Sequence, residues 1–95
     1  MARRRHLIAY DIADPHRLRR VCTVMEAYGQ RLQYSVFLCD LSRAERSRWH
    51  ADVLAVMNLG EDSIVEIDLG PTASPAPLTV IGVPRQLPRS GPTIV

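Results

Sequence analysis

The sequence predicts an α+β protein with a ferredoxin-like β-α-β-β-α-β fold, an antiparallel sheet with both helices on one face. Two stretches with helical spacing of apolar residues each begin at an N-cap signal, and short apolar or alternating stretches flank them. The length of 95 residues, with 46% hydrophobic and 23% charged residues, is typical of one folded domain. Because so short a chain buries only a thin core, pairing with a second copy is expected.

The first half of the chain begins with an apolar run at residues 6–10, which we expect to form a central strand ending at Asp11. Asp14 and Pro15 then predict a helix start, an acceptor at the N-cap and proline at the first helical position. Gly29 is expected to end this helix as a C′ glycine. The inward-facing positions predicted for the helix are Leu18, Val21, Cys22, Met25 and Tyr28.

Residues 30–41 are rich in tyrosine, valine, phenylalanine and leucine and predict two strands, or one bent strand, with a tight reversal near Tyr34. A tyrosine and a phenylalanine on a sheet usually belong to the core, and we favour a core position for Phe37. Ser42 and Glu45 have the spacing of a capping box and predict a second helix. Its predicted inward face is Trp49, Val53, Val56 and Met57.

The last predicted strand of the sheet, residues 63–69, alternates and is therefore half-exposed. Its apolar face carries Val65, Ile67 and Leu69, and its charged face carries Glu66 and Asp68. We expect one domain over residues 1–83, with a core at 5–69, a linker at 70–77 and an extra strand at 78–83. That strand could cover an open sheet edge in the same chain or in a second protomer. Residues 84–95 read as a proline-rich, disordered tail.

All 12 basic residues are arginine, and the first 35 residues hold seven of them against three acids. Arg17, Arg19 and Arg20 have two interpretations: they either form the solvated face of an amphipathic helix, or together with Arg31 they contact nucleic-acid phosphates without reading bases. No stretch has the length and composition of a membrane helix or a signal peptide, so we expect a cytoplasmic protein with no membrane partner.

Asp11 is the carboxylate at the end of an apolar strand, and it has two interpretations. It either hydrogen-bonds within the turn that follows, or it is a ligand for a hard metal ion. Mg²⁺ needs only one or two carboxylates besides water and phosphate oxygens, so two copies of Asp11 near a two-fold axis would supply such a pair. Cys22 and Cys39 have the spacing of neither a zinc site nor a disulfide framework.

Several short motifs stand together in this sequence. They are Tyr10-Asp11-Ile12, Asp14, residues 17–21, residues 28–37 with their string Arg-Leu-Gln-Tyr-Ser-Val-Phe, and Leu41-Ser42. At this spacing they resemble the CRISPR-associated Cas-two (Cas2) family over about residues 6–69. The resemblance implies a ferredoxin-like homodimer of the prokaryotic cytoplasm with an exchanged C-terminal strand. Such a dimer binds double-stranded DNA and bridges dimers of the CRISPR integrase (Cas-one) during spacer acquisition.

The resemblance also implies an endonuclease that uses Mg²⁺, or Mn²⁺ as the alternative ion, to cut RNA or duplex DNA. The family's metal-binding aspartate corresponds to Asp11. Its other residues implicated in activity correspond to Tyr10, Arg20, Arg31 and Phe37. We assign no general base.

Two departures from the family pattern bear on the choice between functions. Leu18 and Leu38 stand where some members carry arginine and glutamate, which leaves a scaffold role intact but weakens the case for a nuclease. The alternatives are therefore a metal-dependent nuclease that is also a scaffold, and a purely non-catalytic scaffold. A small-ligand regulatory module of the same fold is a distant third, because the sequence shows no convergent set of polar pocket residues.

Overall fold

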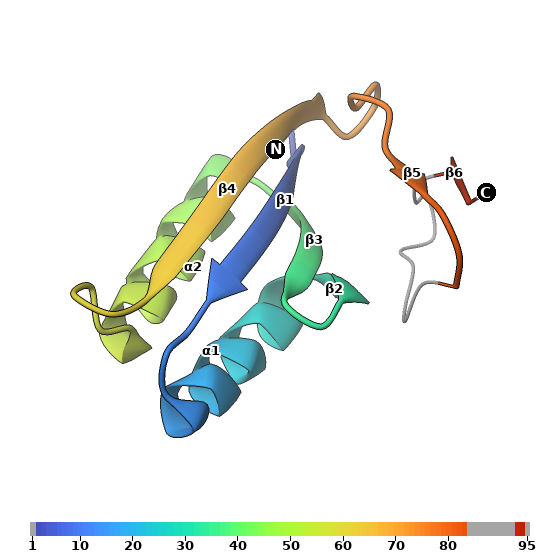
Figure 1. Ribbon diagram of the computed structural model, residues 1–95. Coiled ribbons are helices and arrows are strands. Elements are labelled where there is room, and N and C mark those ends of the chain that lie inside the picture. Colours follow the sequence, from blue (N-terminus) through green and yellow to red (C-terminus); the bar gives the residue numbers. More distant parts are fainter. Residues whose placement is uncertain (1, 84–92, 95) are drawn as a thin grey trace.

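The computed structural model describes residues 2–83, 93 and 94, and it places them in six strands and two helices (Figure 1). In chain order the elements are β1 (Arg4–Asp11), α1 (Pro15–Tyr28), β2 (Gln30–Gln33), β3 (Val36–Leu41), α2 (Arg43–Val56), β4 (Ser63–Pro71), β5 (Thr79–Val80) and β6 (Thr93–Ile94).

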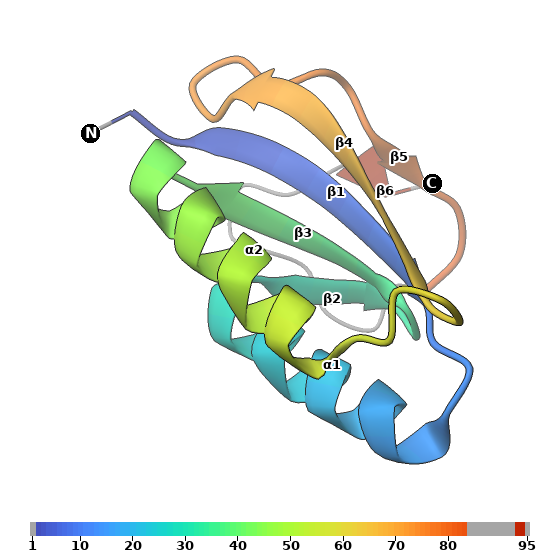
Figure 2. The same ribbon diagram turned by 90° about the vertical axis from the view of Figure 1, so that its left-hand side faces the viewer.

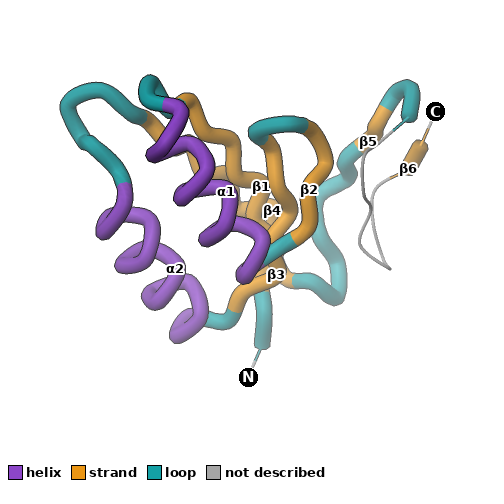
Figure 3. The backbone as a smooth tube through the Cα atoms, turned by 90° about the horizontal axis from the view of Figure 1, so that it is seen from below, coloured by secondary structure: helices purple, strands orange, loops and turns teal. Residues whose placement is uncertain are grey.

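The main sheet has the strand order β2-β3-β1-β4, and all neighbouring strands are antiparallel. β1 lies in the centre, as its apolar sequence predicts. Both helices cover one face of the sheet, and β5 with β6 lies on the other side of it (Figures 2 and 3). The predicted α+β ferredoxin-like fold is therefore confirmed. Among the described residues, no helix is both long and apolar enough to cross a bilayer.

Both helices begin where the capping signals predict. The Asp14 side chain accepts a hydrogen bond of 2.9 Å from the backbone N–H of Arg17. At the second helix the N–H of Glu45 donates to Ser42 Oγ at 3.2 Å, and the N–H of Ser42 donates to Glu45 Oε1 at 2.8 Å. These contacts satisfy backbone donors that the first helical turn leaves unpaired.

The core lies between the sheet and the two helices. Trp49 on α2 is buried and its Nε1–H donates to Met25 Sδ on α1 at 3.2 Å, which joins the two helices above the sheet. The sheet contributes Ile8, Tyr10, Phe37, Cys39 and Leu41, and the helices contribute Val21, Met25, Trp49 and Val53. Burial raises the pKa of the Cys39 thiol to about 12, so this cysteine is a packed apolar residue.

Gly29 ends α1 for a reason that differs from the predicted one. Its φ of −161° and ψ of −166° are extended, so it does not take the left-handed conformation of a C′ glycine. A Cβ atom at this position would instead collide with Cys39 Sγ and with the backbone oxygen of Leu38. Glycine is required here because the chain passes directly against β3.

The two faces of β4 alternate as predicted, but the charged face is the one that points toward the helices. Glu66 accepts a hydrogen bond of 2.8 Å from Arg46 Nε on α2, and its Oε2 lies 3.0 Å from Nδ1 of the buried His6. The apolar residues lie on the opposite face, where Val65 is 56% and Ile67 is 49% exposed. The charges are accommodated by these partners, and an apolar surface is left uncovered.

The C-terminal segment covers a different part of that opposite face. A groove of about 360 Å³ separates residues 78–81 from Leu7, Leu32 and Val36 of the sheet. The extra strand predicted at 78–83 is short, since β5 holds only two residues and pairs in parallel with β6. Most of the predicted tail at 84–95 lies outside the described residues, and its predicted disorder with it. The domain boundaries and the exchange of this strand stay predictions.

Candidate active site and nucleic-acid interface

Asp11 is the last residue of β1, and its side chain is exposed. Within the described part of the chain its carboxylate takes part in no hydrogen bond or ion pair. The turn that follows is instead held by Asp14, which caps α1, and by Asp62, which accepts from the N–H of Ala13 at 2.9 Å. The purely structural interpretation of Asp11 therefore loses its expected partners, and the residue is exposed.

One chain offers an incomplete site for a metal ion at this position. The described residues contain no group of three or more His, Cys, Asp or Glu side chains placed to hold one. Asp11 fits Mg²⁺ or Mn²⁺ only as one ligand among several, because these hard ions accept one or two carboxylates and complete their shell with water and phosphate oxygens. A second Asp11 or a bound phosphate would supply the remainder.

Three of the predicted site residues lie together, and one of them, Tyr10, directly precedes Asp11. The rings of Tyr10 and Phe37 are stacked with centroids 6.1 Å apart, and the guanidinium of Arg31 lies 5.3 Å from the Phe37 centroid. Arg31 also donates a hydrogen bond to Cys22 Sγ. Burial raises the pKa of Tyr10, so its hydroxyl stays protonated and donates to the carbonyl oxygen of Tyr34 at 3.3 Å. Tyr10 and Phe37 thus hold Arg31 in place rather than reach solvent themselves.

The other predicted arginines are divided between two environments. Arg19 and Arg20 are exposed on α1, and a guanidinium N–H of Arg19 lies 2.8 Å from His16 Nδ1. Arg20 makes no ion pair or hydrogen bond through its side chain in the described structure. These two side chains remain available for phosphate groups.

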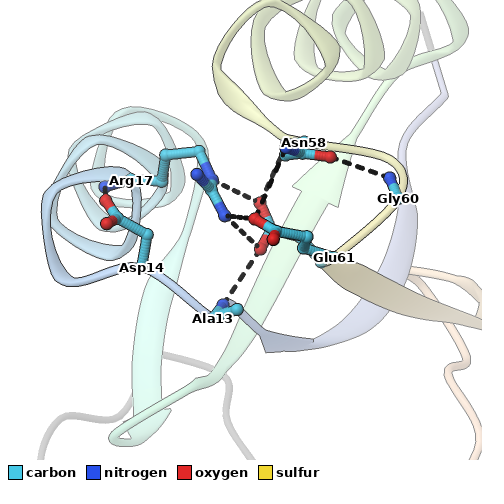
Figure 4. A network of polar contacts seen from close by, with 7 residues as sticks. Ala13, Asp14, Arg17, Asn58, Gly60 and Glu61 are labelled. Carbon is cyan, nitrogen blue, oxygen red and sulfur yellow. Dashed lines mark hydrogen bonds and ion pairs between the residues drawn. The ribbon is translucent and has the colours of Figure 1, made fainter.

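Arg17 is engaged within the chain. Its Nε donates to Asp62 Oδ2 at 2.9 Å and its Nη2 to Glu61 Oε1 at 2.9 Å (Figure 4). The Asp62 side chain is fully buried and also accepts hydrogen bonds from the N–H of Ala13 and, at 2.8 Å, from the N–H of Asn58. The hydrogen bond from the Arg17 guanidinium is the main reason that the pKa of Asp62 lies well below its usual range. The N–H groups of Ala13 and Asn58 lower it further.

This cluster, which we call the Asp62 clamp, joins three segments. It connects the β1–α1 turn directly after Asp11, the first turn of α1, and the loop between α2 and β4. The sequence gives no local signal for it, because Arg17 and Asp62 lie 45 residues apart. The exposure of Tyr34 was also not predictable from its position in an apolar stretch.

Asp11 and the group formed by Tyr10, Arg31 and Phe37 lie within a segment that matches a known family. Residues 4–73 match the family model described as CRISPR associated protein Cas2. The chain belongs to the Cas2 family. The resemblance noted in its motifs is thereby confirmed over most of its length.

Two curated relatives give the degree of similarity. A protein named CRISPR-associated endoribonuclease Cas2 1 from Rhodospirillum rubrum is 39% identical over 66 residues, which are 70% of this chain and 65% of that relative. The chain thus spans just under two thirds of that relative's length. A Cas2 protein from Geobacter sulfurreducens, also named an endoribonuclease, is 35% identical over 76% of each chain.

A solved structure supports the same assignment. The crystal structure of Streptococcus pyogenes Cas2 is 32% identical and superposes with a TM-score of 0.62, covering 66% of this chain and 82% of that one.

Proposed function

We propose that this Cas2-family protein acts in CRISPR adaptation as a homodimer that binds double-stranded DNA and bridges dimers of the CRISPR integrase. We further propose that it is a metal-dependent endonuclease that cuts RNA or DNA. The observation that carries the nuclease part is the exposed Asp11 carboxylate, which has no partner in the described chain and directly follows Tyr10, whose ring stacks with Phe37 beside Arg31. The curated relatives named endoribonucleases support it.

In the proposed reaction Asp11 of each protomer would hold Mg²⁺, or Mn²⁺ as the alternative. An ion held there would supply an activated water and would stabilise the charge that develops on the phosphate. Arg31 is already fixed by Phe37 and Cys22, so it can neutralise a phosphate without first losing side-chain freedom. Arg20 is exposed and can contact the same backbone. Tyr10 and Phe37 act as positioning residues, because their rings are buried.

The scaffold part of the proposal uses a different property of the surface. Exposed arginines contact phosphates and release counterions, so binding of duplex DNA should weaken steeply as salt increases. Arg19 and Arg20 are the candidates on α1, whereas Arg17 is occupied by the Asp62 clamp. Sequence-independent contact of this kind suits a protein that holds captured fragments of any sequence.

The test of the proposed function is Asp11→Asn. We expect cleavage of RNA or DNA with Mg²⁺ to fall about 100-fold or more, because the variant loses a charged metal ligand. Duplex binding, its salt dependence and co-elution with the integrase should be retained. Glu26→Gln, which removes another exposed carboxylate of the same half of the chain, is the matched control and should cut normally.

Three outcomes separate the alternatives. A wild-type protein that cuts neither RNA nor DNA with Mg²⁺ or Mn²⁺ at any pH, yet binds duplex DNA, is a non-catalytic scaffold. Duplex binding that is absent or insensitive to salt contradicts the scaffold. Cleavage that persists in Asp11→Asn removes this residue from the site.

A further inference from the structure

Tyr34 is the tyrosine that the fold leaves in solvent. Its residue is 64% exposed, whereas Tyr10 is buried and Tyr28 donates a hydrogen bond to Asp52 at 2.6 Å. It lies in the two-residue turn between β2 and β3, at the end of the sheet where β1 finishes. In the described chain its ring packs only against the Arg31 guanidinium and is not part of the core.

The turn that carries Tyr34 is held tightly to β1. The hydroxyl of Tyr10 donates to the carbonyl oxygen of Tyr34 at 3.3 Å, and the N–H of Tyr10 donates to the carbonyl oxygen of Ser35 at 3.1 Å. Tyr10 therefore holds this turn in place, and the next residue along β1 is Asp11, the candidate metal ligand. Tyr34 and Asp11 are thus presented from one rigid corner of the sheet.

A fixed positive charge accompanies the ring. The Arg31 guanidinium lies 5.8 Å from the centroid of Tyr34 and 5.3 Å from that of Phe37, and it also donates to Cys22 Sγ. A guanidinium held beside an exposed aromatic ring matches the two parts of a nucleotide, a flat base and an anionic phosphate. A protein partner or a free anion would need only one of these two features.

We propose that Tyr34 is a stacking platform for an unpaired nucleobase, which holds a single strand across Asp11. The inference rests on the proposed nuclease function and names the form of its substrate at the site. Within a duplex each base is stacked between its neighbours and offers no free face to Tyr34, so this contact requires a single-stranded or locally opened substrate. The arginines on α1 contact only backbone and do not make this distinction.

The test uses Tyr34→Ala and Tyr34→Phe with a single-stranded RNA oligonucleotide that carries one 2-aminopurine, without divalent ions so that no cleavage occurs. We expect Tyr34→Ala to weaken single-strand binding about 5- to 100-fold, as loss of one base–aromatic stack does. The 2-aminopurine fluorescence quenched by the wild type should be unquenched in Tyr34→Ala. Tyr34→Phe should match the wild type, because the ring and not the hydroxyl makes the contact.

Binding of the same sequence as a perfect duplex should change less than twofold in both variants. The platform is overturned if Tyr34→Ala binds the single strand normally, or if duplex binding falls by the same factor. It is also overturned if Tyr34→Phe behaves as Tyr34→Ala, which would assign the contact to the hydroxyl. A change in oligomeric state of Tyr34→Ala in sedimentation would assign the ring to contact with a second copy instead.

Failure of this inference and failure of the proposed function remain distinguishable. If the wild type cuts nothing but Tyr34 still quenches the probe, the nuclease proposal fails and the platform stands. If Asp11→Asn abolishes cleavage while Tyr34→Ala binds and quenches normally, the nuclease stands and the platform fails.

Discussion

At Gly29 the chain leaves α1 and passes against β3 with no room for a side chain. Because the obstacles are the Cys39 sulfur and the Leu38 backbone, neither of which can swing away, we expect Gly29→Ala to destabilise the fold by about 1–3 kcal/mol. Urea unfolding followed by circular dichroism measures this change. Gly60→Ala is the control, since its Cβ would meet only Asn58 Oδ1 at 3.4 Å. Equal stability of the two variants would contradict the close approach.

Single residues also show what sequence reasoning can place. Asp11 ends the central strand β1 as the sequence predicts, because polar residues follow a buried strand where it emerges from the sheet, whereas its role as a metal ligand stays a prediction. Phe37 was expected in the core and is buried. Tyr34 differs from Phe37 only by its place in the tight turn, and the sequence predicts the turn without predicting which ring remains outside. Arg17, which the sequence grouped with Arg19 and Arg20, differs from them through a partner in another part of the chain.

At the level of elements, the Asp62 clamp holds the turn after β1 against the loop that precedes β4. The capping signals gave the helix starts correctly because a cap and its partners lie within a few residues. The clamp joins residues 45 positions apart, and the sequence does not distinguish a buried loop aspartate such as Asp62 from an exposed one. Its role becomes visible only when the two loops are placed side by side.

We expect Asp62→Asn to loosen that turn. An amide keeps the size of the side chain but presents N–H donors to groups that also donate, so the thermal midpoint should fall by about 5 °C or more. The rate of cleavage at Asp11 should fall with it. Glu61→Gln is the control, because Glu61 is exposed and, within the described residues, its carboxylate accepts hydrogen bonds from Arg17 Nη2 and the Asn58 side chain alone.

The pH dependence of stability gives this prediction a second measurement. The pKa of Asp62 is lowered in the folded state, whereas an unfolded chain has an aspartate pKa of about 3.9. The clamp therefore contributes stability above about pH 4 and loses it as the pH falls below that value. In Asp62→Asn the free energy of unfolding should depend less on pH below about pH 4 than in the wild type. An unchanged pH dependence would show that another carboxylate is responsible.

At the scale of the whole molecule, the alternation of apolar and charged residues in β4 does not by itself decide which face of the strand meets the helices. The period of two fixes which residues share a face but not which face meets the helices. Here Arg46 and His6 draw Glu66 inward, so the apolar face with Val65 and Ile67 is left outside. A fold derived from hydrophobicity alone would place β4 the other way round.

The exposed apolar face of β4 supports the proposed homodimer, and Ile67→Glu tests it. A charge placed in the interface should weaken self-association at least about tenfold, whereas the isolated fold should be little changed because Ile67 is 49% exposed. Analytical ultracentrifugation over a concentration series measures the effect. Leu54→Glu on α2, where the leucine is 43% exposed, is the control. Normal dimers of Ile67→Glu would move the interface elsewhere.

Residues 78–81 lie over Leu7, Leu32 and Val36 on the same side of the sheet as Ile67. This segment is tethered to β4 by only a few residues, so its local concentration does not fall when the protein is diluted. A molecule that binds at Leu7, Leu32 and Val36 must therefore displace residues 78–81, whereas Val65 and Ile67 on the same side stay open to a second copy. The segment therefore reduces non-specific contacts at this part of the apolar face while the β4 part remains accessible.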